Sequence, residues 1–164
     1  MIRVGLGFDS HRLVPGRKLL LGGVDVPSPF GEKAHSDGDV LLHALCDAIY
    51  GACGRGDIGE HFPDSDPRWK DKPSSHFLLE AGRLAKREGW RLVNVDATIL
   101  LETPKLSPWK KAIAESIRGI LAPLWDLEAS AVSIKAKTME RCDAVGRSEA
   151  IVAHVAVLLE SGGS

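Results

Sequence analysis

The N-terminal segment carries a carboxylate and an imidazole two residues apart, at Asp9 and His11. In a β-strand, residues two apart point to the same face, so both side chains can reach one ion. A carboxylate with an imidazole suits a borderline divalent cation such as zinc. The same spacing also arises by chance with the histidine on a surface turn, so the pair alone leaves both interpretations open.

A third candidate ligand, His43, lies in the segment HSDGDVLLH among apolar neighbours. With Asp9 and His11 it would complete three protein ligands and leave a fourth position open, as in catalytic zinc sites. A buried histidine with a backbone or carboxylate partner is the alternative. Asp39 and Asp47 lie one turn on either side of His43 and could orient its ring, although helix capping explains Asp39 equally well.

Two further segments carry groups suited to hydroxyls and phosphates. In GDIGEHFPDSDP (56–67), glycines allow close backbone approach and carboxylates can accept hydroxyl groups, while Asp-Pro turn chemistry explains part of the pattern. In KAKTME (135–140), Thr138 offers a hydroxyl to phosphate and Glu140 an oxygen ligand for magnesium. Arg147 offers a fork for phosphate, but a solvated charged surface accounts for Arg147 and Glu149 equally well.

Interleaved strands and helices must position these groups. The apolar patterns predict strands over 2–8, 91–101 and 131–137, a strand pair over 18–26, and helices over 39–50, 75–88 and 107–120. Ser36 or Asp37 and Gly51 are the expected ends of the first helix, and Ser107 the expected cap of the third. Residues 27–33 are expected to form turns and 54–72 a long loop. Periodicity does not decide 151–159, for which we favour a strand.

Length and composition favour one domain over 1–164, with an α+β fold in which helices cover one mixed sheet. The 21 basic and 22 acidic side chains give a net charge of -1 and no electrostatic case for a nucleic-acid or membrane partner. No segment has the length of a transmembrane helix, and MIRVGLGFDS lacks a secretory signal pattern. Three cysteines without a CxxC pair indicate free thiols and a cytoplasmic location.

Five segments of the chain together resemble one family. They are GFDSHRL, LGGVDVP, AHSDGDVLLHALCDAIYGACGRGDIGEHFPDSDP, NVDATILLETPKL and KAKTMER…GRSEAI. In this order they are similar to the 2-C-methyl-D-erythritol 2,4-cyclodiphosphate synthases, and the resemblance covers nearly the whole chain. It implies a lyase of the non-mevalonate route to isoprenoids, which converts 4-diphosphocytidyl-2-C-methyl-D-erythritol 2-phosphate to the cyclic diphosphate and CMP.

The resemblance also implies roles for individual residues. Asp9, His11 and His43 take the positions of zinc ligands, and Glu140 that of the carboxylate holding magnesium or manganese on the diphosphate. His35 and Thr138 match the pair assigned to transition-state stabilisation. The implied substrate contacts are Asp9, Ser10, His11, His35, Ser36, Asp57, Ile58, Gly59, Phe62, Pro63, Asp64, Ser65, Asp66 and Arg147. The implied cytidine contacts are Leu101, Glu102, Thr103, Pro104, Lys105, Leu106, Ser107, Lys137, Thr138, Met139 and Glu140.

By the same resemblance the chain forms a homotrimer with each active site between two subunits, where residues 137–140 come from the neighbour. Arg147 and Glu149 could line a pore on the trimer axis that holds an isoprenoid diphosphate. The chain departs from the family pattern at Cys142-Asp143-Ala144, where Leu-Gly-Phe is usual. It also has Ser10 where valine is common and Lys137 where threonine is expected.

Two other functions remain open from the residues alone. A zinc-dependent phosphatase or phosphodiesterase would need a base to activate water, and no dedicated base stands beside the expected metal position. A non-catalytic metal or nucleotide binding module would bind without turnover, and it gives no reason for His35 and Thr138 to lie beside the metal.

Overall fold

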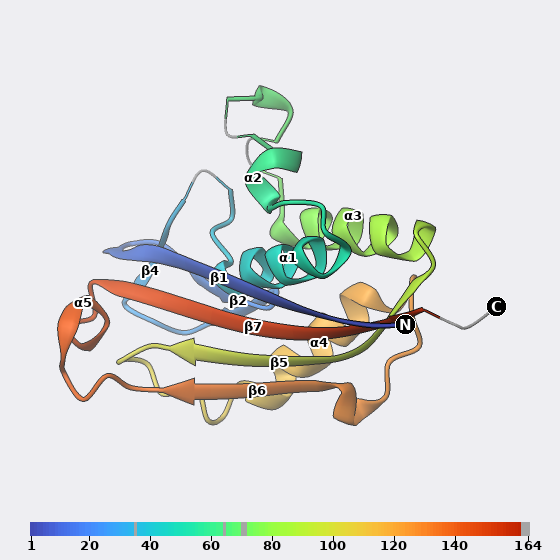
Figure 1. The fold of residues 1–164 in the computed structure, drawn as a ribbon. Helices are drawn as coiled ribbons and strands as arrows, with labels where there is room; N and C mark the ends of the chain where they lie inside the picture. The colour runs from blue at the N-terminus through green and yellow to red at the C-terminus, as the bar shows by residue number, and fades with distance from the viewer. Residues whose placement is uncertain (35, 64, 70–71, 162–164) are drawn as a thin grey trace.

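The computed structural model describes residues 1–34, 36–63, 65–69 and 72–161, so His35 and Asp64 lie outside the described part of the chain. Its centre is a five-stranded sheet in the order β4-β1-β7-β5-β6, in which β5 and β6 are parallel and the other neighbours antiparallel (Figure 1). The strands are β1 Ile2–Pro15, β4 Phe30–Lys33, β5 Trp90–Leu100, β6 Val132–Lys137 and β7 Ala150–Ser161. A separate hairpin joins β2 Leu19–Leu21 to β3 Val24–Val26.

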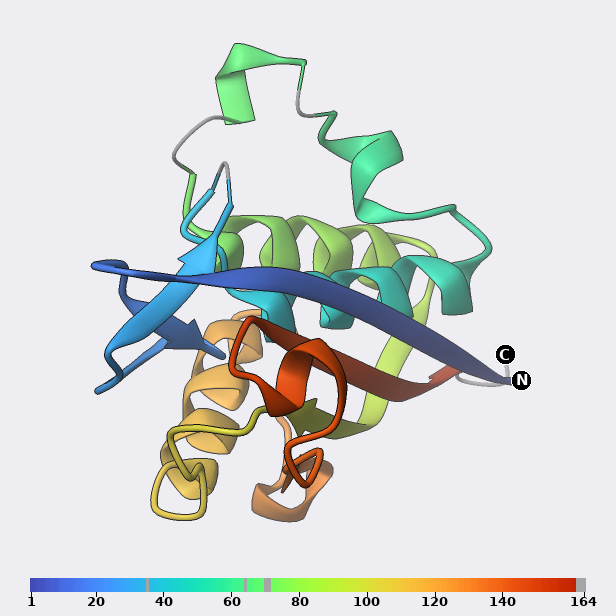
Figure 2. The same cartoon turned by 90° about the vertical axis from the view of Figure 1, so that its left-hand side faces the viewer.

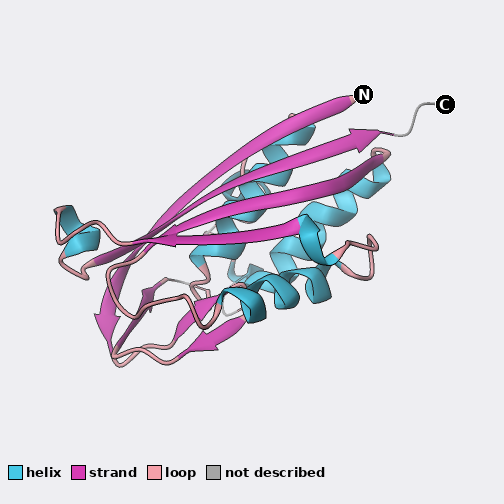
Figure 3. Ribbon diagram, turned by 90° about the horizontal axis from the view of Figure 1, so that it is seen from below, coloured by secondary structure: helices cyan, strands magenta, loops and turns pink. Residues whose placement is uncertain are grey.

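Three long helices cover one face of this sheet (Figure 3). They are α1 Val40–Cys53, which packs on β1 and β7, α3 Ser74–Arg87, and α4 Lys110–Leu121, which packs on β6. Shorter helices are α2 Ile58–His61 and α5 Asp143–Gly146, with 3-10 turns at Pro67–Trp69 and Ala129–Ala131. The expected α+β fold with one mixed, helix-covered sheet is therefore confirmed. None of the described helices combines the length and the apolar character that crossing a bilayer needs.

The long strand β1 alternates between the two sides of the sheet. Its odd-numbered residues from Gly5 to Leu13 face the helices and are buried or half-buried. Its even-numbered residues Ile2, Val4, Leu6 and Phe8 are exposed on the other side, between 55% and 77% of their area. One face of the strand thus belongs to a core that is contiguous with α1, and the other presents apolar side chains to the exterior.

The turn expected over 27–33 is wrong, because Phe30–Lys33 forms the edge strand β4. The first strand, expected to end at Phe8, continues to Pro15 and offers an antiparallel partner to β4 from Arg12 onward. Pairing between segments distant in sequence here overrides turn-like composition. The expected loop 54–72 also contains α2 and a 3-10 turn.

Two helix ends also differ from the expected ones. Asp39, not Ser36 or Asp37, caps α1 by accepting the N–H of Leu42, and the helix runs past Gly51 to Gly54, whose φ of 69° gives a left-handed end. The third predicted helix begins at Lys110, and its N-cap residue, Trp109, makes no side-chain capping bond, so Ser107 does not cap it. The strand favoured for 151–159 is confirmed as part of β7.

Candidate metal centre and ligand-binding segments

Asp9 lies between two imidazoles. Its Oδ2 is 3.1 Å from Nε2 of His11 and 3.2 Å from Nδ1 of His43. Asp9 and His11 come from the inner face of β1, and His43 from the first turn of α1. One ligand atom from each residue lies within 4.8 Å of the other two, so these three side chains could hold a metal ion together.

The backbone contact between α1 and β1 makes this convergence possible. A Cβ built on Gly5 would lie 1.8 Å from the carbonyl oxygen of Ala48, and one on Gly7 would lie 1.8 Å from that of Ala44. No other residue fits at either position, so the absence of side chains lets the helix rest directly on the strand. The next inward-facing residues of β1 after Gly7 are Asp9 and His11, which therefore meet the helix at His43.

The second ring nitrogen of His11 is held from behind. Nδ1 lies 2.7 Å from Oε2 of Glu32 and 2.9 Å from the carbonyl oxygen of Gly38. Burial opposes the imidazolium, but the hydrogen bonds with Asp9 and Glu32 outweigh it and raise the pKa of His11 to about 10. Burial raises the pKa of Glu32, and the hydrogen bond with His11 partly opposes that shift.

His43 is held by Ser74, which is itself held by Asp37. Ser74 donates its hydroxyl hydrogen to Asp37, so the same oxygen accepts from Nε2 of His43 at 2.9 Å. Asp37 also accepts the backbone N–H of Ser74 at 2.9 Å, and Ser36 Oγ lies 3.3 Å from the same Nε2. When a cation takes the place of the proton between Nδ1 and Asp9, a neutral His43 with its proton on Nε2 would offer the lone pair of Nδ1 as a ligand.

The donor set fits a divalent cation. Burial alone would raise the pKa of Asp9, but hydrogen bonds with His11 and His43 hold it well below its usual range, so the carboxylate is ionised. Each imidazole keeps a partner at the nitrogen that faces away from Asp9. One carboxylate oxygen and two imidazole nitrogens are ligands that zinc accepts, and second partners of this kind orient such ligands.

The two aspartates expected to flank the ring of His43 have other roles. Asp39 is fully buried and accepts N–H groups from Gly22, Gly23 and Leu42, which ties the β2–β3 hairpin to α1. Burial raises its pKa to about 6 despite these hydrogen bonds. Asp47 accepts the N–H of Ile58 at 2.8 Å, at the start of α2. The capping alternative for Asp39 is thus confirmed. Among the described residues neither carboxylate forms a hydrogen bond with the ring of His43, so the expectation that they orient it is wrong.

The described residues of the predicted substrate segment 57–66 lie on α2 and the turn after it. Asp57 caps α2 by accepting the N–H of Glu60. The ring centroids of Phe62 and Phe77 are 4.7 Å apart, and that of Phe77 lies 6.4 Å from that of His43. Asp66 forms an exposed ion pair with Arg68. Of the other predicted residues, Ile58 and Gly59 belong to α2, and Pro63 and Ser65 are exposed.

The predicted cytidine segments meet each other at the end of β5 and β6. Leu101 donates its N–H to the carbonyl of Lys137 at 3.0 Å, and Glu102 accepts the N–H of Met139 at 3.0 Å. Thr138 donates its hydroxyl to Glu140 at 2.8 Å. Between these segments and the Asp9 group, the described residues make no hydrogen bond or ion pair. The other predicted members are Thr103 and Pro104, joined by a cis peptide bond, the exposed Lys105 and Ser107, and the buried Leu106.

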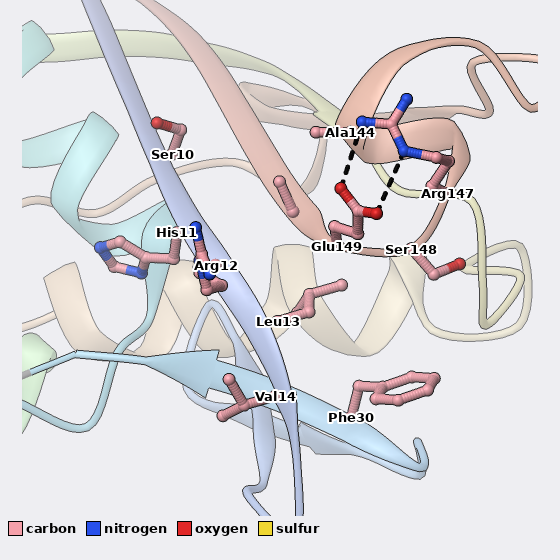
Figure 4. A pocket seen from close by; sticks show the side chains of 11 residues that line it. Ser10, His11, Arg12, Leu13, Val14, Phe30, Ala144, Arg147, Ser148 and Glu149 are labelled. Atoms are coloured by element: carbon pink, nitrogen blue, oxygen red, sulfur yellow. Dashed lines mark hydrogen bonds and ion pairs between the residues drawn. The ribbon is translucent and has the colours of Figure 1, made fainter.

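A pocket lies between β1 and the turn that follows α5. Ser10, His11 and Phe30 line it from one side, and Arg147 and Glu149 from the other (Figure 4). The guanidinium of Arg147 pairs with Glu149 at 3.1 Å, as the dashed lines in Figure 4 show. Arg147 therefore reaches the surroundings of Ser10, but its charge is already paired within the chain.

Comparison with known proteins decides the family. The model of the YgbB family matches residues 2–160. The chain belongs to the YgbB family. Two relatives are named 2-C-methyl-D-erythritol 2,4-cyclodiphosphate synthase. The one from Geobacillus kaustophilus is 50% identical over 98% of this chain and 99% of its own length. The one from Treponema denticola is 49% identical over 96% of both chains. A solved structure of such a synthase in a CDP-bound form superposes with a TM-score of 0.87 at 42% identity, covering 96% of this chain and all of that one. The family resemblance, and with it the prediction of an enzyme, is confirmed.

One departure of this YgbB-family chain from the usual pattern has a clear local structure. Asp143 stands where glycine is usual and adopts a φ of 57°, in the left-handed region that favours glycine. Its carboxylate accepts the N–H groups of Val145 and Gly146 at 2.8 and 3.2 Å, which stabilises the turn that α5 forms. Aspartate is among the residues that tolerate this conformation through such bonds. Ala144, in place of the usual phenylalanine, leaves space in the pocket of Figure 4.

Sequence reasoning missed the residues behind the two imidazoles, Glu32 and Ser74. Glu32 lies in the segment expected to form turns, and Ser74 lies just before the helix expected over 75–88, although it is the first residue of α3. The only signal in the sequence was the charged residue Glu32 in a segment expected to form turns. That signal became informative once the structure placed β4 beside β1.

Proposed function

We propose that this chain converts 4-diphosphocytidyl-2-C-methyl-D-erythritol 2-phosphate into 2-C-methyl-D-erythritol 2,4-cyclodiphosphate and CMP. The observation that supports this most is the meeting of Asp9, His11 and His43, from segments far apart in the chain, in a sequence about half identical to the named synthases. The CDP-bound neighbour supports a cytidine nucleotide as part of the ligand. We propose that residues 1–164 form one catalytic domain.

The reaction is an intramolecular phosphoryl transfer. An oxygen of the 2-phosphate forms a bond to the β-phosphorus, and the bond from that phosphorus to the oxygen bridging to CMP breaks. The electron pair of the broken bond leaves with CMP. Because the attacking phosphate is already anionic, the step needs no strong general base, and positioning and charge neutralisation supply most of the rate.

The protein's part is to hold the two phosphates close together against their repulsion. A zinc ion at Asp9, His11 and His43, and magnesium or manganese at Glu140, would supply positive charge to the phosphate oxygens. The proposed roles of His35 and Thr138 are to donate hydrogen bonds to the oxygens that gain charge during transfer. Ser10, Ser36 and the residues of 57–66 would bind the erythritol phosphate part, and 101–107 with 137–140 the cytidine part.

We further propose a homotrimer with shared sites. The exposed apolar row of Ile2, Val4, Leu6 and Phe8 gives one side of the sheet a surface suited to a second copy. A hollow lined by Leu6, Phe8 and His154 continues this surface across β7. The absence of bonds between the Asp9 group and the segment with Thr138 and Glu140 in the described chain is consistent with completion of each site by a neighbouring subunit.

Phosphorus NMR of the products tests the proposal. A cyclase gives two mutually coupled phosphorus signals of a cyclic diphosphate together with CMP. A zinc-dependent hydrolase gives separate monophosphates, and a binding module gives no change in the substrate. Either of the last two outcomes, with zinc present and the substrate bound, would contradict the proposed function.

A further inference from the structure

Glu32 is a buried carboxylate that contacts the metal group from behind. It lies on the edge strand β4, and its side chain has no exposed area. Its Oε2 is 2.7 Å from Nδ1 of His11 and accepts the N–H of Val40 at 3.0 Å. Val40 is the first residue of α1, so one oxygen atom joins the strand that carries Asp9 and His11 to the helix that carries His43.

Packing alone does not explain a carboxylate at this position. Removing a carboxylate from water costs several kcal/mol unless hydrogen bonds or charges compensate. Oε1 of Glu32 has no hydrogen-bond partner among the described residues, so compensation comes through Oε2 alone. A leucine would fill a similar volume without this cost. The contact with His11 is therefore what accounts for a carboxylate at this position.

That contact determines which nitrogen of His11 carries the proton in its neutral form. Nδ1 lies between two oxygen acceptors, Oε2 of Glu32 and the carbonyl of Gly38 at 2.9 Å. With acceptors on both sides, Nδ1 must be the donor, and the lone pair belongs to Nε2. Nε2 is the nitrogen that faces Asp9 at 3.1 Å, where a metal ligand is required.

We infer that Glu32 is a positioning residue for the metal centre, which keeps the proton of His11 on Nδ1 and fixes the orientation of its ring. The inference deepens the proposed function, because it rests on a divalent cation binding at Asp9, His11 and His43. Partners of this kind behind metal-bound histidines typically change metal affinity about 10–100-fold when removed. The carbonyl of Gly38 remains as a second acceptor, so we expect the low end, about tenfold.

Zinc affinity without substrate, measured by competition with a chelator, tests the inference. Glu32→Leu should bind zinc about tenfold more weakly than the unaltered chain. Glu32→Gln should recover most of the affinity, because its amide oxygen can accept from His11 and Val40. Glu88→Gln is the matched control, since that carboxylate pairs with Arg55 on the exterior and should leave zinc affinity unchanged.

Two further measurements separate positioning from a role in stability. The visible spectrum of the cobalt-substituted protein should change in Glu32→Leu and return in Glu32→Gln. The rise in unfolding temperature on adding zinc should also shrink in Glu32→Leu, whereas a purely structural role would lower the metal-free and zinc-bound temperatures equally.

Folded Glu32→Leu protein that binds zinc within twofold of the unaltered chain, with an unchanged cobalt spectrum, overturns the inference. If Glu32→Leu does not fold, nitrogen-15 NMR of the unaltered zinc-bound protein decides: a ring proton on Nδ1 of His11 is expected, and one on Nε2 refutes it. An unaltered chain that binds no zinc at all contradicts the proposed metal site as well. If the unaltered chain binds zinc and the Glu32 variants bind it equally well, only the inference about Glu32 fails.

Discussion

At the residue scale, the two imidazoles of the metal group present different nitrogens to Asp9. His11 presents Nε2 and His43 presents Nδ1. The remaining nitrogen of each ring has a buried partner, Glu32 for His11 and Ser74 for His43. Turning either ring over would break a hydrogen bond on both sides, so the site is preorganised before a cation binds.

His43→Ala should lose most of the bound zinc and nearly all turnover, because it removes one of three protein ligands. Elemental analysis of the purified protein and a steady-state assay measure the two effects. His76→Ala removes an imidazole that packs on Trp69 instead, and should retain zinc. Full activity in metal-free His43→Ala protein would refute the ligand assignment.

Zinc binding should release about one proton per site near pH 7.5, because the metal-free imidazole of His11, with its pKa raised to about 10, is charged there. Calorimetry in two buffers of different ionisation enthalpy counts this proton. The shift stabilises the metal-free fold fully below pH 6.5, and this contribution is lost as pH rises from 6.5 through 10. Zinc affinity should change in the opposite direction and increase with pH over that interval. Binding without proton release would contradict the protonated state of His11.

Thr138→Ala should lower kcat more than it changes KM, by roughly 1–3 kcal/mol of transition-state stabilisation. Thr138→Ser keeps the hydroxyl that bonds Glu140 and should retain most of the rate. Steady-state kinetics of both variants measure the difference. An unchanged kcat in Thr138→Ala would remove this residue from the mechanism.

At the scale of elements, the spacing of the metal ligands depends on how closely α1 rests on β1. Gly7→Ala would place a methyl group against the backbone carbonyl of Ala44, which cannot move aside as a side chain would. We expect a loss of about 1–3 kcal/mol in unfolding free energy and weaker zinc binding. Chemical denaturation and chelator competition measure these. Gly119→Ala, on α4 with open space around it, should be neutral or stabilising.

Elements with a strong local pattern could be predicted from the sequence, and those that depend on a distant partner could not. The apolar period of α1 was sufficient, whereas the pattern of 151–159 only favoured the strand that β7 forms. Strand β4 is short and turn-like, and exists because β1 continues to Pro15 beside it. Helix α4 starts at Lys110 although Ser107 offers a good capping sequence, and Leu106 just before that serine is buried in the core.

The same distinction holds for the site. Asp9 and His11 could be predicted from their spacing of two within a strand, and His43 from its place in the segment HSDGDVLLH. Glu32 and Ser74 contact those ligands only through the packing of β4 and α3, and neither has a local pattern. Residues that touch the metal group from behind thus needed the structure.

At the scale of the whole molecule, the helices cover one face of the sheet and leave the other open, as the two views in Figures 1 and 2 show. Leu6→Lys, which places a charge in the exposed apolar row, should give monomers with little activity. Light scattering and activity at equal concentration measure this. Glu115→Lys, on the outer side of α4, should leave the assembly intact. A monomeric unaltered chain at working concentration would contradict the shared-site proposal.

The separation of the Asp9 group from Thr138 and Glu140 has a consequence for genetics. If each site takes these two halves from different copies, a chain altered at His43 and another altered at Thr138 are each inactive because they lack different halves of the site. When the two variant chains are co-expressed, or unfolded and refolded together, turnover should return. A mixed assembly contains a site that combines the intact metal group of one chain with the intact Thr138 segment of the other. Two alleles that both alter His43 would never rescue each other.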